Sequence, residues 1–243
     1  MSGTEHVEQR LRRLLRDNRF RPGERVGSER ALAEQLRVSR SVLRRALERL
    51  EAEHLVRRAM GQSGGVFADD GKIQRHLNTV QGVPDMVRRQ GLSTETRVLR
   101  LELAQPFPDE RRALEIDETA PVIRTVRVRY AGNATLSLDT SVLPARRFPG
   151  LLSENLDGSL YALLTEHYGL QIDRAEETVE ATTADARQAE MLEIPQGSGL
   201  LEIYRVTYDA DNWAAEYAHD FFRADRTRMH MQRVGTNWKR SRL

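Results

Sequence analysis

The first 68 residues contain three short runs of apolar residues at helical spacing, and a tight break follows each run. In the first run, Val7, Leu11, Leu14 and Leu15 are four, three and one positions apart, and Arg21-Pro22-Gly23 ends the run. Apolar residues that recur three or four positions apart lie on one face of a helix. The pattern therefore predicts a short helix near the N-terminus with one apolar face.

The second and third runs predict two further helices with a tight turn between them. Ser28 offers an N-cap to the second helix and Ser39 offers one to the third, because a serine oxygen accepts a hydrogen bond from a backbone N–H of the first helical turn. The turn itself is as short as Val38-Ser39. The apolar stripe of the second helix is Leu32, Ala33 and Leu36, and that of the third, which runs to about Glu53, is Val42, Leu43, Ala46, Leu47 and Leu50.

A β-hairpin follows the third helix. Residues 55–57 precede a glycine-rich tip at residues 61–65, and Val66 and Phe67 follow it. Apolar runs on both sides of a glycine-rich segment predict two paired strands. Helix, helix, tight turn, helix and hairpin is the order of elements in a winged helix-turn-helix.

The charge of the chain is distributed unevenly between its two parts. Residues 1–68 carry 15 arginines against 9 acids, a balance of +6, while residues 69–243 carry 23 basic and 27 acidic residues, a balance of −4. Only Lys72 and Lys239 are lysines, so nearly every cation is a guanidinium, whose planar fork suits phosphate oxygens and guanine edges. A GC-rich coding bias is an alternative reason for arginine over lysine, but it does not explain the uneven distribution. This distribution favours a DNA-facing N-terminal part.

The arginines of the third helix lie opposite its apolar stripe. Arg40 and Arg44 are four positions apart, so they share a face and can enter a major groove together. The wing can reach the adjacent minor groove, where glycines allow close backbone approach. Each arginine alone is equally explained as a solvated surface charge, and their combination with the turn and the wing favours DNA. On this pattern the predicted DNA-binding residues are Arg30, Arg40, Ser41, Arg44, Arg45, Arg58, Gly64 and Gly65.

A polar, turn-prone segment, Asp69-Asp70-Gly71-Lys72, separates this head from the remainder. We expect a DNA-binding domain over residues 1–68, a linker over 69–75, an effector-binding and dimerisation domain over 76–230 and a basic tail over 231–243. The remainder predicts hairpins with interspersed short helices, typical of an antiparallel sheet of α+β class. Its expected strands are 98–103, 122–130, 135–143, 172–183, 200–208 and 214–222, and its expected helices end at Gln90 or cover 109–114, 156–168 and 185–192.

Two arginines in the strand expected over residues 122–130 indicate an anion site. Arg127 and Arg129 alternate with apolar residues, so they share a face and lie about 7 Å apart at the backbone, a spacing from which both can bind one anion. The next strand places Ser137, Asp139 and Ser141 on one face, so Asp139 approaches the arginines if the hairpin pairs in register. A cross-strand Arg/Asp pair at the surface is the simpler alternative.

Several classes of protein are excluded. The chain has no cysteine, which excludes disulfides, thiolate zinc sites and cysteine nucleophiles and fits a reducing cytoplasm. No run approaches 18 apolar residues and no secretory signal is evident, so we expect a cytoplasmic protein without a membrane span. The six histidines have no metal-binding spacing, and no phosphate loop, dinucleotide fingerprint or Gly-x-Ser-x-Gly motif occurs. We therefore expect no cofactor, no metal and no enzyme; neighbours Glu176 and Glu177 face opposite sides of a strand and cannot form a carboxylate pair.

The N-terminal residues resemble the signature of GntR-type bacterial transcription regulators. The resemblance implies that Arg30, Arg40 and Arg44 are DNA contacts, with Ser39 and Ser41 on phosphates or base edges. The chain departs from the family pattern at Gly27, where proline is usual, at Leu43 and at the wing. The residues that carry the resemblance are Pro22-Gly23, Ser28-Glu29-Arg30, Leu32-Ala33, Val38-Ser39-Arg40, Arg44, Ala46-Leu47 and Leu50.

The remainder resembles the UTRA effector domain of the HutC subfamily, whose fold is related to chorismate lyase. Family members bind small effectors, frequently sugar phosphates or other anions. The resemblance implies effector-binding roles for Arg127, Arg129, Asp139, Ser159 and Glu216, with a hydroxyl from Thr94 or Thr96. The residues that carry it include Arg127-Val128-Arg129, Asp139, Phe148-Pro149-Gly150-Leu151, Gly158-Ser159-Leu160-Tyr161, Arg174-Ala175-Glu176-Glu177, Arg205, Glu216-Tyr217 and Phe222-Arg223-Ala224-Asp225-Arg226.

Together these features predict a ligand-responsive transcription regulator, most simply a repressor. A homodimer would place two heads on a palindromic site of double-stranded DNA, because the symmetry of the protein must match that of the operator. A small anionic metabolite would then change the DNA affinity. Two alternatives stay open: a lyase-like enzyme for a small carboxylate with a fused DNA-binding head, and an architectural DNA binder without a ligand.

Overall fold

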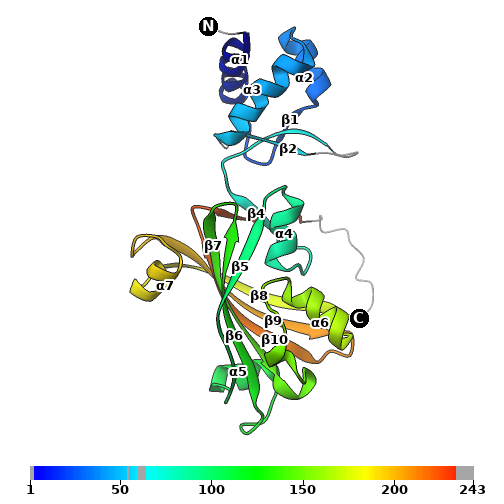
Figure 1. The fold of residues 1–243 in the computed structure, drawn as a ribbon, viewed down its shortest axis with the longest axis vertical. Helices are drawn as coiled ribbons and strands as arrows, with labels where there is room; N and C mark the ends of the chain where they lie inside the picture. Colours follow the sequence, from blue (N-terminus) through cyan, green and yellow to red (C-terminus); the bar gives the residue numbers. More distant parts are fainter. Residues whose placement is uncertain (1–2, 54, 60–63, 234–243) are drawn as a thin grey trace. The chain divides into compact units, whose positions relative to one another are not determined.

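The computed structural model describes residues 3–53, 55–59 and 64–233. The chain divides into two compact units, Met1–Lys72 and Ile73–Leu243, whose elements are labelled in Figure 1. Residues 73–75, which we expected in the linker, instead belong to a strand of the second unit, β4 (Ile73–His76). The expected wing tip at residues 61–63 and the tail from residue 234 lie outside the described residues.

The first unit has three helices and a small sheet. The helices are α1 (Gly3–Asp17), α2 (Glu29–Leu36) and α3 (Arg40–Ala52), and the strands are β1 (Arg25–Gly27), β2 (Val56–Ala59) and β3 (Gly65–Ala68). β2 and β3 pair as the expected hairpin, and β1, which the sequence did not indicate, pairs with the other edge of β3.

The two serine caps form as their positions predict. Ser28 Oγ accepts a hydrogen bond from Ala31 N at 3.1 Å, and Ser39 Oγ accepts one from Val42 N at 3.4 Å. Between them, Arg37 adopts the left-handed conformation, with φ of 51°. This conformation ends α2 and leaves only two residues before α3 begins.

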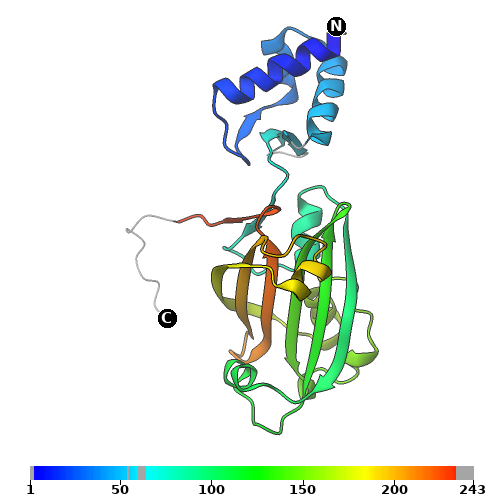
Figure 2. The ribbon, with the colours of Figure 1, turned by 90° about the vertical axis from the view of Figure 1, so that its left-hand side faces the viewer.

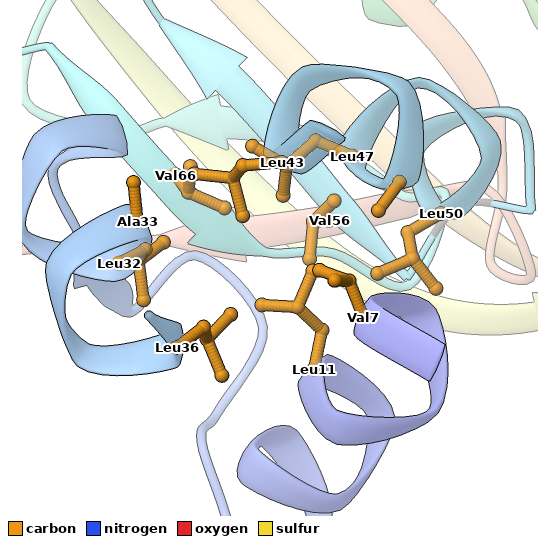
Figure 3. Packing of buried hydrophobic residues seen from close by; sticks show 11 residues of the cluster. Val7, Leu11, Leu32, Ala33, Leu36, Leu43, Leu47, Leu50, Val56 and Val66 are labelled. Atoms are coloured by element: carbon orange, nitrogen blue, oxygen red, sulfur yellow. The ribbon is translucent and has the colours of Figure 1, made fainter. Parts of the chain in front are cut away.

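The helical stripes of the first unit converge on one core. Figure 3 shows side chains of α1, α2 and α3 meeting those of β2 and β3. Leu43, Leu47 and Leu50 of α3 are fully buried at its centre. The residues labelled in Figure 3 are Val7, Leu11, Leu32, Ala33, Leu36, Leu43, Leu47, Leu50, Val56 and Val66.

The second unit is built on a six-stranded antiparallel sheet in the order β5-β6-β7-β10-β9-β8. Its strands are β5 (Thr94–Ala104), β6 (Val122–Ala131), β7 (Ala134–Pro144), β8 (Ile172–Thr183), β9 (Gly199–Asp209) and β10 (Ala214–Arg223). A separate parallel pair joins β4 to β11 (Thr227–His230). The α+β class expected from the sequence is confirmed.

Helices cover both faces of this sheet. The helices are α4 (Val83–Arg89), α5 (Pro108–Leu114), α6 (Leu160–Tyr168) and α7 (Ala186–Met191), and two short 3-10 turns follow β7, at Ala145–Arg147 and Leu151–Ser153. α4 and α6 lie against one face, called the α6 face below, and α5 and α7 lie against the other, called the α7 face (Figure 1). Figure 2 looks onto the α7 face, where strands remain uncovered between these two short helices.

We expect a substitution in the first core to destabilise the first unit selectively. Leu47→Ala removes a fully buried side chain and should lower the free energy of unfolding by about 2–5 kcal/mol, because a cavity is left behind. Both tryptophans, Trp213 and Trp238, follow the first unit in sequence. The unfolding transition in urea, followed by helical circular dichroism, should therefore shift to lower urea concentration, while the transition followed by tryptophan fluorescence should stay in place. An equal shift of the fluorescence transition would show that the two units unfold together.

Candidate functional site

The polar side chains of the central strands meet on the α6 face. The β6–β7 hairpin pairs Arg127 with Asp139 and Arg129 with Ser137, the register that the predicted anion site required. Beside them, β10 pairs Asp220 with Asp139. These groups surround a cavity of about 30 Å³, lined by Gln81, Gly82, Val83, Arg127, Arg129, Asp139, Ser141, Leu160, Tyr161, Arg205, Glu216 and Asp220.

Arg129 makes three hydrogen bonds to its neighbours through Nε and Nη1. Its Nε donates to Asp139 Oδ2 at 2.9 Å, and its Nη1 donates to Thr96 Oγ1 at 2.6 Å and to the carbonyl oxygen of Gly158 at 3.0 Å. Asp139 is held in turn by Ser137 Oγ, which donates to its Oδ1 at 2.6 Å. Arg129 and Asp139 therefore form a buried, hydrogen-bonded ion pair, and the alternative of a surface pair is wrong.

Arg127 has the same burial but few partners. Its side chain donates one hydrogen bond, from Nη2 to Ser141 Oγ at 3.3 Å, while its Nε and Nη1 are buried with no acceptor among the described residues. Burial, and then repulsion from Arg129, lower the pKa of Arg127 to about 10, although Asp139, Glu216 and Asp220 oppose this shift. A buried cation with open donors is costly, so this side chain is poised to accept an anion.

A second cation, Arg205 of β9, organises the acids on the other side of the cavity. Its Nη1 donates to Asp220 Oδ2 at 3.0 Å and its Nη2 donates to Glu216 Oε2 at 3.5 Å. Glu216 also accepts the hydroxyl of Tyr161 at 2.6 Å. Behind Arg205, Glu177 accepts a bidentate pair of hydrogen bonds from Arg75 at 2.6 and 2.8 Å.

The pKa values of two acids in this network shift in opposite directions. Burial raises the pKa of Asp220 to about 7, against the attraction of Arg205 and with repulsion from Asp139 and Glu216. Burial also acts to raise the pKa of Glu216, but Arg205 and the Tyr161 hydroxyl hold it below its ordinary value. One oxygen of Asp220, Oδ1, is buried without a hydrogen-bond partner. The cavity thus offers open donors on Arg127 and an open acceptor on Asp220.

The remaining predicted effector residues lie outside the cavity lining. Thr96 reaches the site only through its bond to Arg129. Ser159 is the N-cap of α6 and donates to Asp85 Oδ2 at 3.0 Å, and the hydroxyl of Thr94 is buried without a partner. Only Arg127, Arg129, Asp139 and Glu216 of the predicted set line the cavity.

Among the lining residues that were missed as site residues, Tyr161, Arg205 and Asp220 belong to the hydrogen-bond network of the cavity. Asp220 had a detectable signal, because Glu216 and Asp220 are four positions apart on one strand and alternation places both on one face. Arg205 had none within its own segment, since its acidic partners lie on two other strands, β8 and β10. Glu177 was excluded as half of a carboxylate pair, but it lies behind Arg205 as a counter-ion.

The size of the cavity limits what it can hold as it stands. About 30 Å³ accommodates one or two water molecules. A metabolite therefore enters only if covering residues move, and these come from residues 81–83 and from α6.

The predicted DNA-binding residues lie on α2, on α3 and at the wing. Arg40 and Arg45 are exposed and have no hydrogen bond or ion pair within the described part of the chain. Arg44 Nε donates to Glu29 Oε2 at 2.9 Å, which raises the pKa of Arg44, and Arg30 lies 3.9 Å from Glu34. These residues share the exposed surface opposite the first core.

The serines and the wing residues have structural partners of their own. The Oγ atoms of Ser39 and Ser41 lie 3.0 Å apart, and Arg58 donates from Nε to Glu51 at 2.9 Å. The carbonyl oxygen of Gly64 accepts a hydrogen bond from Arg25 at 2.9 Å. Gly65 has φ of 153°, and a Cβ there would lie 2.8 Å from the carbonyl oxygen of Gly27, so strand packing alone requires this glycine.

Comparisons with known proteins now decide the family. Residues 4–66 match the model of the bacterial regulatory proteins of the gntR family, and residues 89–228 match the UTRA domain. The chain belongs to the GntR family. The two matches place the GntR signature on the first unit and the UTRA domain on the second, as the resemblance implied.

Relatives of this GntR protein are transcriptional repressors. It is 33% identical to the repressor PhnF of Mycolicibacterium smegmatis over 90% of this chain and 88% of that protein, and 25% identical to the repressor NagR of Bacillus subtilis over 90% of both. The crystal structure of PhnF from Mycobacterium smegmatis superposes with a TM-score of 0.68 at 27% identity, covering 95% of this chain and all of that one. The GntR protein is therefore a transcription regulator, and the lyase-like alternative is not favoured.

Two further observations concern the described residues alone. None of their helices is both long and apolar enough to cross a membrane. Nor do they contain a group of three histidine or acidic side chains that could hold a metal ion.

We expect the two neighbouring arginines to have opposite effects on stability. Arg127→Met should raise the free energy of unfolding of the ligand-free protein by about 1–3 kcal/mol, because it removes a buried charge with unmade hydrogen bonds. Arg129→Met should lower it by about 3–5 kcal/mol, because Asp139 loses its partner. Urea unfolding of the two variants measures both effects, and a loss of stability in Arg127→Met as large as in Arg129→Met would refute the distinction.

Proposed function

We propose that this GntR regulator represses transcription by binding a palindromic DNA operator as a homodimer, and that a small anionic metabolite in the α6-face cavity changes its DNA affinity. Arg127 supports the proposed anion binding, because it is a buried guanidinium with two nitrogens that lack acceptors among the described residues. Buried polar groups in folded proteins nearly always have partners, and an exception marks a place where a partner binds. The repressor names of PhnF and NagR support the direction of regulation.

The DNA surface centres on the N-terminal half of α3. In this proposal α3 enters the major groove, Arg40, Arg44 and Arg45 face the DNA, and Ser39 and Ser41 contact phosphates or base edges. Arg30 of α2 lies where that helix crosses the backbone, and Arg58, Gly64 and Gly65 approach the minor groove from the wing. Arg40 and Arg45 support the proposal because they are exposed and have no ion pair within the part of the chain that the structure describes, so they are free to replace condensed counterions on DNA.

The open atoms of the cavity define the chemistry of the effector. Arg127 requires an acceptor with negative charge, such as a phosphate, phosphonate or carboxylate. The open Oδ1 of Asp220 lies in the same cavity and requires a donor, such as a hydroxyl or amino group. An anion that carries a neighbouring hydroxyl or amino group satisfies both.

The α7 face of the sheet supports the proposed dimer. Four side chains are half-buried there: Tyr204, Tyr217, His219 and Phe221. The ring of His219 stacks on Tyr204 with the ring centroids 4.4 Å apart, and it lies tilted against Phe221 with the centroids 4.5 Å apart. Tyr217, His219 and Phe221 border a groove of about 340 Å³ between α5 and α7. Aromatic side chains are enriched at protein interfaces, and a second copy packed by a twofold axis would cover them. Sedimentation equilibrium of Phe221→Asp against the natural chain tests this; a variant dimer as stable as the natural one would remove the face from the proposal.

Selection of bound duplexes from random DNA tests operator recognition. We expect a palindromic site, and we expect Arg44→Ala to weaken binding to it by about 1–3 kcal/mol and to relax the base preference at one position of each half-site. Fluorescence anisotropy with the selected duplex, and with a scrambled competitor at the same salt concentration, measures both. Equal losses on the two duplexes would reject base reading by Arg44.

A thermal-shift screen tests the effector site. A panel of phosphates, phosphonates and small carboxylates with hydroxyl or amino groups should contain compounds that raise the melting temperature and change operator affinity about five- to 150-fold. Arg127→Met should retain operator binding and lose both responses. A compound that raises the melting temperature of Arg127→Met as much as that of the natural chain would place the ligand elsewhere.

A further inference from the structure

Glu29 and Arg44 form an ion pair on the proposed DNA surface. Glu29 is the first residue of α2, next to the N-cap Ser28, and Arg44 lies one turn into α3. The bond runs from Arg44 Nε to Glu29 Oε2 at 2.9 Å. The two helices thus share an ion pair across the turn, on the side away from the core.

The hydrogen bond to Glu29 uses only one edge of the Arg44 guanidinium. Glu29 occupies the Nε edge, while the two terminal nitrogens of Arg44 have no hydrogen-bond acceptor among the described residues. The Arg44 side chain is 60% exposed and that of Glu29 is 28% exposed. Arg44 therefore projects its terminal fork toward solvent with its stem held in place.

We propose that Glu29 is the positioning residue that makes Arg44 selective for guanine, an inference that rests on the proposed DNA-binding function of α3. With Nε held by Glu29, Arg44 can make a bidentate contact only through Nη1 and Nη2. Guanine presents two acceptors to this fork, O6 and N7, whereas adenine presents one acceptor and one donor. The two terminal N–H groups of an arginine held in this direction can both donate to guanine, whereas on adenine one of them meets a donor.

The carboxylate of Glu29 also disfavours the alternative partner of Arg44. An arginine without a fixed stem can turn to a phosphate, a contact that carries no sequence information. Glu29 opposes this because its negative charge repels phosphate oxygens nearby. Arg40 and Arg45 have no such acid bonded to them in the described chain, so they remain free to follow the backbone. In this assignment, one arginine of α3 reads a base and its neighbours contribute mainly affinity.

The test is Glu29→Gln with the duplex obtained by selection from random DNA. We expect the preference for guanine at the Arg44 position to fall from about 5- to 150-fold toward unity. Affinity for scrambled duplex should rise about twofold or more, since one negative charge is lost and Arg44 can turn to a phosphate. The slope of log affinity against log salt on that duplex should steepen by about 0.9, the value for one added phosphate contact.

A positioning role predicts that Glu29→Gln binds the selected duplex more weakly and the scrambled duplex more tightly. A structural defect would weaken binding to both. Glu34→Gln, which removes one charge from the same helix, is the matched control and should leave the base preference at the Arg44 position unchanged. Replacing that guanine by 7-deazaguanine should weaken binding of the natural chain and hardly affect Glu29→Gln.

The outcomes also distinguish this inference from the function on which it rests. Failure to select any preferred duplex would overturn the proposed function. A selected duplex whose guanine preference survives Glu29→Gln, with helical circular dichroism unchanged, would overturn the role of Glu29 alone. Glu29→Asp keeps the charge and should retain part of the guanine preference at the Arg44 position. A guanine preference in Glu29→Asp as low as in Glu29→Gln would show that charge is not the cause.

Discussion

A guanidinium buried without enough acceptors is the constraint around which the candidate site of the second unit is arranged. Arg127 lies on the central hairpin of the sheet, has two nitrogens with no partner, and loses part of its basicity to burial and to Arg129. Removing a charge from water costs free energy, and only partners of opposite charge offset that cost. The surrounding side chains keep Arg127 in this state because the nearby acids already have partners: Arg129 bonds to Asp139, and Arg205 bonds to Asp220. Under the proposed function, this cost in stability provides a preformed anion site.

Arg127 and Arg129 show that residue type alone does not decide a role. They are two positions apart on one strand and face the same side, yet Arg129 is bonded to Asp139, Thr96 and Gly158. One arginine holds the site together and the other remains open. The same contrast occurs on α3, where Arg44 is held by Glu29 and Arg40 is not. In both units an acid accepts a hydrogen bond from the Nε edge of one arginine, while another arginine of the same element has no acid hydrogen-bonded to it among the described residues.

Local features of the chain were predictable from the sequence because neighbouring residues determine them. The caps at Ser28 and Ser39 and the pairing of Arg127 with Asp139 follow from spacing and turn length. Strand β1 and the parallel pairing of β4 with β11 were not predictable, since each depends on a partner far away in sequence. A register shift between Arg129 and Tyr130 had no signal either.

The residues of the candidate site were likewise predictable only where they belong to one local element. Arg127, Arg129 and Asp139 belong to one hairpin, so alternation within two strands placed them together. Arg205 and Glu177 join them only because β10 inserts between β7 and β9, an order that no local pattern encodes. Ser159 and Thr94 were assigned by resemblance, and their hydroxyls lie outside the cavity lining because Ser159 caps α6 and bonds to Asp85. Sequence reasoning therefore found the half of the site that one hairpin makes.

In the proposed function, an anion on Arg127 and DNA on α3 bind to the same molecule and influence one another. Calorimetric titration of the effector into the free protein, and then into the protein saturated with its selected duplex, tests this directly. Linkage requires the two effector dissociation constants to differ by the same factor by which the effector changes DNA affinity, about five- to 150-fold. Equal dissociation constants in the two titrations would contradict the account, because a ligand that binds both states equally cannot regulate either.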